Sequence, residues 1–156
     1  MVLSHTKQID EKEIRDVYDR GNDFYRFFLG PSMLYTSGVF ESEQDTLEQA
    51  QENKMTIACK KIHLDKEKSE KVLDIGCGWG TFACFAADKF GADVTGITIS
   101  KEGFNYAVQQ AKDKKLEDKV HFKCVDYRDI PNEKYDKITA FEMAEHVGVK
   151  NFQLFL

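Results

Sequence analysis

Three glycines on alternate positions, Gly76, Gly78 and Gly80, follow a short apolar run that contains one acid, Asp74. Such a run is typical of a buried parallel strand, and glycines directly after it mark a backbone that turns sharply. Dinucleotide-binding turns space their glycines as G-x-G-x-x-G and hold a pyrophosphate. The alternate spacing instead suits an amino-acid moiety, whose ammonium Asp74 or nearby carbonyls can accept and whose carboxylate favours backbone N–H groups. The alternative is an ordinary glycine-rich turn that binds nothing.

Polar residues also stand where three later strands are predicted to end. Thr98 ends the second strand, Asp126 follows the third, and the pair Glu145-His146 follows the fourth. Ligands and catalytic residues of open α/β sheets gather at this carboxyl edge. For Glu145 and His146 the alternative is that both cap a helix beginning near Val149, since an acid is favourable at a helix start.

The elements that must position these residues alternate between strand and helix. The sequence predicts four strands, at Val72–Ile75, Ala92–Thr98, Val120–Val125 and Tyr135–Phe141. Apolar residues at helical spacing predict helices over Thr81–Phe90 and after Ser100, a residue placed to cap the second. This order predicts an α/β fold with a Rossmann-like parallel sheet.

The residues ahead of the first strand are predicted to be helical. Asp10 and Glu13 resemble a capping box, and Ser42–Leu64 reads as one long amphipathic helix. Between them, Asp23–Leu29 is densely aromatic. It either packs its rings on the domain or forms a lid that lines an acyl or substrate channel. We therefore predict a helical, substrate-side segment over 1–66 and the N-terminal part of the sheet domain over 67–156.

Composition excludes several classes of function. A chain of 156 residues with 42% hydrophobic residues suits a single domain with a sizeable core. The net charge of −5 argues against nucleic acid as a partner, because phosphate binding needs a basic face. The four cysteines form no C-x-x-C pair, so we expect reduced thiols, an intracellular protein and no metal site. No apolar run approaches the roughly 20 residues that cross a bilayer.

Several motifs, in this order, resemble the cyclopropane-fatty-acid synthase family of class I S-adenosylmethionine methyltransferases. They are Asp19–Tyr25, Tyr35–Gly38, LDIGCGWG, GITIS, DYRD and EMAEHVG. The likeness is greatest to the fungal branch that methylates carbon nine of the sphingoid base in glucosylceramide. Thr98, where many methyltransferases have an acid, fits this family. Bacterial cyclopropane synthases have Tyr-Ser-Cys where this chain has Tyr35-Thr36-Ser37, which favours the fungal branch.

The resemblance implies S-adenosylmethionine as the cofactor and assigns its contacts. The implied contacts are Tyr35, Thr36, Leu73, Asp74, Ile75, Gly76, Cys77, Gly78, Trp79, Gly80, Thr81, Thr98, Ile99, Ser100, Lys101, Glu102, Gly103, Asp126, Tyr127 and Arg128. In the third-strand group, Asp126 is placed to accept the adenine amine, and Tyr127 or Arg128 to cover the ring. Glu145 takes the position that helps to hold a bicarbonate ion, and is the predicted catalytic residue.

The implied reaction is C-methylation of a lipid alkene, with an unsaturated sphingolipid or fatty acyl chain as substrate. The alternatives are a cyclopropane-fatty-acyl-phospholipid synthase, a small-molecule N-methyltransferase and a non-catalytic cofactor-binding fragment. The fourth strand, Tyr135–Phe141, is expected to present an unpaired edge. We therefore expect the N-terminal part of a longer enzyme, inactive alone, whose full-length form associates with the endoplasmic reticulum membrane.

Overall fold

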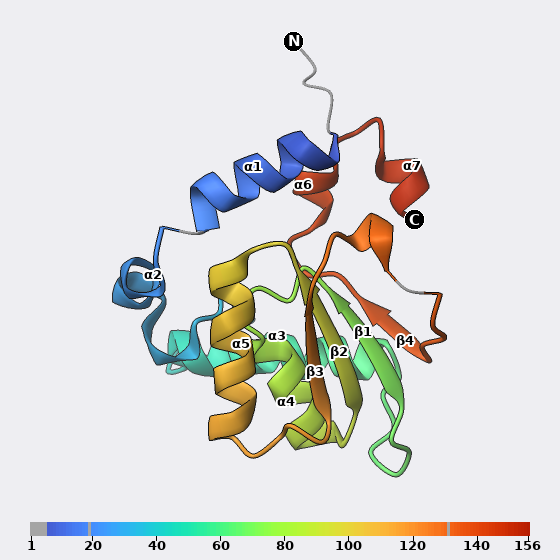
Figure 1. Ribbon diagram of the computed structural model, residues 1–156. Helices are drawn as coiled ribbons and strands as arrows, with labels where there is room; N and C mark the ends of the chain where they lie inside the picture. Colours follow the sequence, from blue (N-terminus) through green and yellow to red (C-terminus); the bar gives the residue numbers. More distant parts are fainter. Residues whose placement is uncertain (1–5, 19, 131) are drawn as a thin grey trace.

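The fold is a parallel sheet with helices packed on it and above its carboxyl edge (Figure 1). The computed structural model describes residues 6–18, 20–130 and 132–156, so Asp19 of the first family motif lies outside the described residues. The strands are β1 Lys71–Ile75, β2 Asp93–Thr98, β3 Val120–Cys124 and β4 Lys137–Thr139. The helices are α1 Lys7–Tyr18, α2 Asn22–Leu29, α3 Leu47–Lys61, α4 Thr81–Phe90, α5 Lys101–Asp113, α6 Ala144–Val147 and α7 Phe152–Phe155, with 3-10 turns η1 Gly30–Ser32 and η2 Tyr127–Asp129.

The four strands lie in the order β3-β2-β1-β4 and are all parallel. The register pairs Val72 with Val94 and Val94 with Val120. This confirms the predicted α/β class and places β1, with its glycine turn, in the interior of the sheet. The fourth strand is shorter than predicted, because only Lys137–Thr139 pairs with β1. Its Ile138 is 59% exposed, and β4 is an edge of the described sheet.

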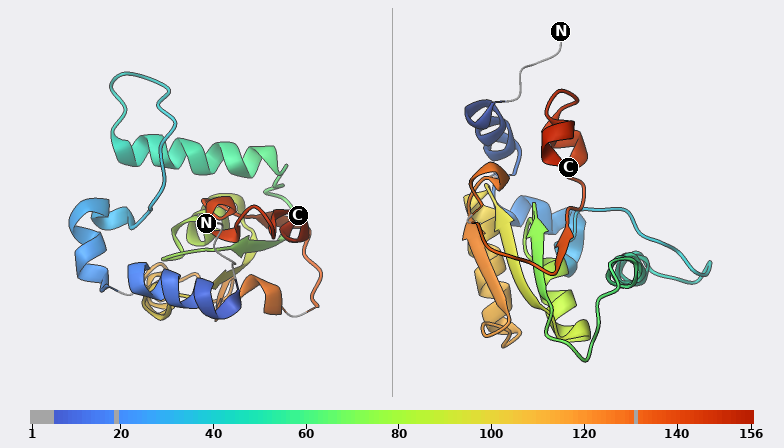
Figure 2. Two further views of the ribbon diagram at one scale, coloured as in Figure 1. Left: turned by 90° about the horizontal axis from the view of Figure 1, so that it is seen from above. Right: turned by 90° about the vertical axis from the view of Figure 1, so that its right-hand side faces the viewer.

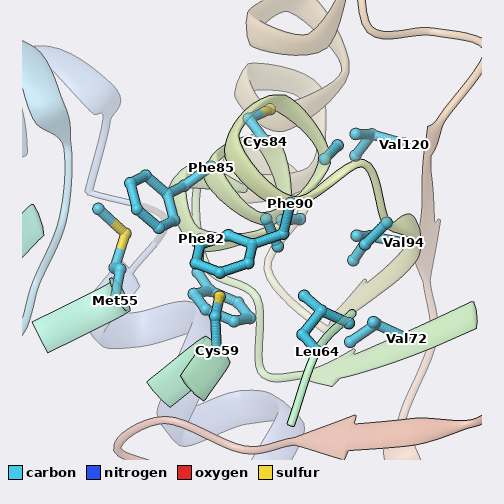
Figure 3. Close-up of a cluster of buried hydrophobic side chains, with 14 of the residues drawn as sticks. Met55, Cys59, Leu64, Val72, Phe82, Cys84, Phe85, Phe90, Val94 and Val120 are labelled. Carbon is cyan, nitrogen blue, oxygen red and sulfur yellow. The ribbon is translucent and has the colours of Figure 1, made fainter. Parts of the chain in front are cut away.

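The main core lies between the sheet and helices α3 and α4 (Figure 3). Phe82, Phe85 and Phe90 of α4 pack among apolar side chains of three strands and of α3. The strand residues are Val72, Val94 and Val120, and the α3 residues are Met55 and Cys59. Burying a large apolar side chain is worth about 1.5–3 kcal/mol, so this cluster fixes α4, and with it the glycine turn, against the sheet. Because Cys59 belongs to the same core, α3 packs directly on the sheet. The domain boundary predicted between residues 66 and 67 stays a prediction.

Two helix predictions were wrong at their starts. The long helix begins at Leu47 rather than Ser42, because Thr46 caps it by accepting a hydrogen bond from the Gln49 N–H. Residues 42–45 form a separate turn in which Asp45 accepts from the N–H groups of Glu41 and Ser42. The first helix begins at Lys7, so the capping box predicted at Asp10 is absent and Asp10 is a buried residue of the first turn.

Helices α1, α6 and α7 lie above the carboxyl ends of the strands (Figure 1). Figure 2 shows α1 beside the α6–α7 segment, and the ring of Tyr18 in α1 lies 6.2 Å from that of His146 in α6. Figure 2 also shows the segment between η1 and α3 as a long loop that extends away from the sheet before α3 returns. The carboxyl edge of the sheet is therefore covered by helices from both ends of the chain.

Candidate cofactor-binding site

One cavity opens at the carboxyl edge of the sheet, beneath α1 and beside the segment that follows η1. Most of the predicted contacts line it: Tyr35, Thr36, Asp74, Ile75, Gly76, Cys77, Gly78, Trp79, Thr81, Thr98, Ile99, Ser100, Gly103, Asp126, Tyr127 and Arg128. The structure thus brings together residues that the sequence spreads over nearly a hundred positions. Their contact with a cofactor stays a prediction.

Five predicted site residues lie outside this lining: Leu73, Gly80, Lys101, Glu102 and Glu145. Leu73 packs with Ile75 and Ile97 in a cluster separate from the α4 core, and unlike those two residues it does not reach the cavity. Gly80 faces the ring of Phe122 rather than open space. Glu145 is an exposed residue of α6, although its neighbour His146 lines the cavity.

Gly78 and Gly80 of the glycine turn differ in what surrounds them. A Cβ added to Gly78 would meet no atom within 4 Å, and its φ of +54° is a conformation that L side chains rarely adopt. A Cβ on Gly80 would instead lie 2.5 Å from the ring of Phe122. Gly80 therefore permits close packing of α4 on the sheet, whereas Gly78 leaves room for a ligand. Backbone N–H groups of Gly76 and Cys77 both donate to the Ile97 carbonyl at 2.9 Å, which fixes the turn against β2.

Asp74 is buried near the end of β1 and is only 2% exposed. Its Oδ1 accepts a hydrogen bond from the Thr139 hydroxyl of β4 at 3.0 Å. Burial raises the pKa of Asp74 to about 7, because removing the carboxylate from water disfavours its charged form. Near neutral pH the group is thus divided between its neutral and charged forms.

The carboxylate of Asp126 is held by Arg128 through two guanidinium contacts, at 2.8 and 2.6 Å. Burial alone would raise the pKa of Asp126, but the hydrogen bonds from Arg128 outweigh it and lower that pKa. Arg128 also pairs with Asp10 of α1 at 3.0 Å, and its guanidinium lies 5.0 Å from the ring centre of Tyr127. This network ties α1 to the end of β3. Both Asp126 oxygens already accept from Arg128, which the prediction of an adenine contact did not foresee.

A third polar group surrounds Thr36. The Gln51 side-chain amide of α3 donates to the carbonyls of Leu34 and Thr36, each at 3.1 Å, and so fixes the backbone of this segment. The Thr36 hydroxyl donates to Glu142 Oε1 at 2.5 Å, and Lys54 Nζ contacts the same hydroxyl. Lys54 also pairs with Glu142 Oε1 at 2.9 Å. The hydrogen bonds from Thr36 and then Lys54 lower the pKa of Glu142.

Trp79 of the glycine turn anchors the aromatic helix α2. Its Nε1 donates to Asn22 Oδ1 at 2.7 Å, and its ring lies 4.8 Å from that of Tyr25. Tyr25 is buried, whereas Phe27 is 92% exposed and no phenylalanine of α2 lines the cavity. The aromatic segment thus packs through Tyr25, and the cavity-lining residues above the sheet come from α1 and α6 rather than from α2.

The acid–imidazole pair lies within α6 and not ahead of a helix beginning near Val149. α6 spans Ala144–Val147, and α7 starts only at Phe152. The alternative that Glu145 and His146 cap a helix starting near Val149 is therefore wrong.

Sequence reasoning missed several lining residues: Ile14, Tyr18, Lys54, Glu142 and Met143. Glu142 and Met143 follow the fourth predicted strand directly, so their position at its carboxyl end was an available signal. Lys54 lies on a helix whose charged residues mostly face water, and no local pattern distinguishes it.

Comparisons with known proteins agree with this geometry. The chain is 46% identical over 160 residues to sphingolipid C9-methyltransferase 2 of Gibberella zeae, covering 99% of this chain and 30% of the relative. It is 47% identical over 163 residues to sphingolipid C9-methyltransferase of Candida albicans, covering 99% and 31%. The crystal structure of mycolic acid cyclopropane synthase CmaA1 complexed with SAH and CTAB matches with a TM-score of 0.87 and 29% identity, over 93% of this chain and 50% of that chain.

The chain therefore spans less than a third of these fungal relatives and half of that solved structure. A model of the mycolic acid cyclopropane synthetase family matches residues 5–156. These findings confirm the resemblance carried by the motifs and the Rossmann-like methyltransferase fold. Because the match covers nearly the whole sequence, the chain belongs to the mycolic acid cyclopropane synthetase family.

Proposed function

We propose that the protein to which this chain contributes transfers a methyl group from S-adenosylmethionine to a carbon of a lipid alkene. The proposed acceptor is carbon nine of the sphingoid base in glucosylceramide. The observation that carries the proposal is the 46–47% identity to fungal sphingolipid C9-methyltransferases across 99% of the chain. The relatives contain further residues that this chain does not span, so the activity is proposed for the full-length protein.

The cavity fits the cofactor on its own features. The open face of Gly78 leaves room for a ligand beside the start of α4, where the helix dipole and free N–H groups favour the carboxylate of a methionine moiety. Thr98 and Asp126 supply polar groups at the ends of β2 and β3. When bound, S-adenosylmethionine supplies an electrophilic methyl group.

The residues of this chain would position the reactants and exclude water. An isolated alkene is a poor nucleophile, so it must lie close to the methyl group and in line with it. The resulting positive charge on the lipid is stabilised by aromatic faces, by about 0.5–2 kcal/mol each, and Tyr18 lines the cavity for this role. A base must then remove a proton from the lipid. We assign that role to a bicarbonate ion held with the help of Glu145.

We further propose a membrane surface as the second partner of the full-length protein, at the endoplasmic reticulum. The exposed phenylalanines of α2, led by Phe27, support this, because such a surface can contact the lipids that hold the substrate. None of the helices in the described residues is long and apolar enough to cross a membrane.

The test is product analysis with the full-length protein. Incubation with S-adenosylmethionine and a Δ8-unsaturated glucosylceramide should add one carbon, and NMR should show a methyl group on a retained double bond. A cyclopropane ring would instead support the cyclopropane synthase alternative. Methylation of amines but not of lipids would support the N-methyltransferase, and cofactor binding without any product a non-catalytic module.

A further inference from the structure

Four acids line the cavity within the described residues: Asp10, Asp74, Asp126 and Glu142. They differ in what they face. Asp10 and Asp126 both pair with Arg128, at the end of β3. Asp74 is buried beside Thr139 on the neighbouring strand and is 2% exposed as a residue, whereas the side chain of Glu142 is 47% exposed. Only Glu142 combines substantial access to the cavity with a position away from Arg128.

The neighbours of Glu142 place it at the glycine turn. Phe141 packs its ring 4.6 Å from that of Phe82, in the first turn of α4. On the other side, a Cβ added to Gly76 would lie 2.4 Å from Met143 Sδ. Glu142 therefore lies beside the part of the cavity that the glycine turn forms, where the proposed function puts the methionine end of the cofactor.

One oxygen of the Glu142 carboxylate is hydrogen-bonded, and the other is available to a ligand. Thr36 and Lys54 both contact Oε1, and no hydrogen bond to Oε2 occurs among the residues that the structure describes. The backbone of Glu142 has a φ of +50°, a sparsely populated conformation for a residue other than glycine. Strained backbone held by specific contacts is a common feature of ligand sites.

From these observations we propose that Glu142, positioned by Lys54 and Thr36, is the anionic group that receives the ammonium of the cofactor's methionine moiety. The inference rests on the proposed function and deepens it. It replaces Asp74 as the ammonium acceptor, and leaves Asp74 as a buried acid that joins β1 to β4 through Thr139. The hydrogen bonds that keep Glu142 ionised agree with this role, because an ammonium is best received by a permanent negative charge.

The test compares two ligands by calorimetry: S-adenosylhomocysteine and its analogue in which hydrogen replaces the α-amino group. Wild-type protein should bind S-adenosylhomocysteine more tightly. Glu142→Gln should lose about tenfold to a hundredfold in affinity for it, the range expected for one hydrogen bond to a charged group, with little change for the analogue. Glu52→Gln, which removes one exposed charge from α3, is the matched control and should behave as wild type.

The outcomes separate the two proposals. Absence of S-adenosylhomocysteine binding by the wild type would overturn the proposed function itself. Binding with equal preference for the amine in wild type and Glu142→Gln would overturn only the inference. Loss of that preference in Asp74→Asn, and not in Glu142→Gln, would return the role to Asp74.

A measurement on the wild type alone covers the case in which Glu142→Gln does not fold. The charged and titratable groups that interact with Glu142 are Lys54 and Tyr18. Between pH 5.5 and pH 8.5, about one and a half units either side of the pKa of Asp74, the charge of Asp74 changes, whereas the lowered pKa of Glu142 keeps that carboxylate ionised. The preference for the amine should therefore persist at the lower pH. A preference that collapses there would identify Asp74, whose pKa is about 7, as the receptor and refute the inference.

Discussion

Replacing Asp74 by Asn should flatten the pH dependence of stability. The pKa of this buried carboxyl is raised from 3.8 to about 7. Because the folded state holds the proton more tightly than the unfolded state, the contribution of Asp74 to stability is greatest below about pH 4 and declines as the pH rises to about 7. A difference of about 3 pKa units corresponds to a loss of about 4 kcal/mol over that window.

The size of this loss makes it measurable. A typical domain has a net stability of about 5–15 kcal/mol, so the contribution of one carboxyl is a large share. The Asn amide oxygen can still accept the hydrogen bond from Thr139, and Asn does not ionise. The difference in unfolding free energy between Asp74→Asn and wild type should therefore shift in favour of the variant by roughly 3–5 kcal/mol from pH 4 to pH 8.

The assay is urea unfolding at several pH values, followed by the fluorescence of Trp79, which is buried in the glycine turn. Asp118→Asn, which changes an exposed acid, is the control and should run parallel to wild type. Carboxyls whose pKa is lowered, such as Asp126 and Glu133, stabilise the folded state less as the pH falls below their usual pKa values. These contributions are the same in the variant and the wild type, so they cancel in the difference between the two. Parallel pH curves for Asp74→Asn and wild type would refute the burial argument.

Three further predictions concern binding and turnover in the full-length protein. Gly78→Val should abolish S-adenosylmethionine binding, because its side chain enters the open space of the cavity; a β-branched residue is strained at this positive φ, so a retained cooperative thermal transition is the folding control, and calorimetry that shows unchanged affinity would contradict the site. Glu145→Gln should reduce kcat at least tenfold, and far more than it weakens cofactor binding, if Glu145 helps to hold the base; equal losses in both would make it a structural residue. Phe27→Ser should reduce binding to vesicles of neutral lipid several-fold without changing cofactor affinity, and unchanged co-sedimentation would argue against α2 as the membrane contact.

Local patterns were sufficient for the central strand–turn–helix unit. The apolar run of β1, the glycine spacing and the helical period of Thr81–Phe90 all depend on residues close in sequence, and the helix has those bounds. Ser100 caps α5 as predicted, because a cap bonds to a backbone N–H only three residues away. The α3 start was misplaced because the turn around Asp45 competes with the helix for the same residues, and helical periodicity does not detect that competition.

The sequence by itself therefore determined the family, the parallel sheet and most of the residues around the cavity. Only the tertiary structure decided which charges in that cavity are free to meet a ligand. Asp126 is paired with Arg128, Asp74 is buried and accepts a hydrogen bond from Thr139, and Glu142 pairs with Lys54 across 88 positions of the chain. The state of a charged group depends on its burial and on partners within a few ångströms, and folding sets both through contacts between residues far apart in sequence.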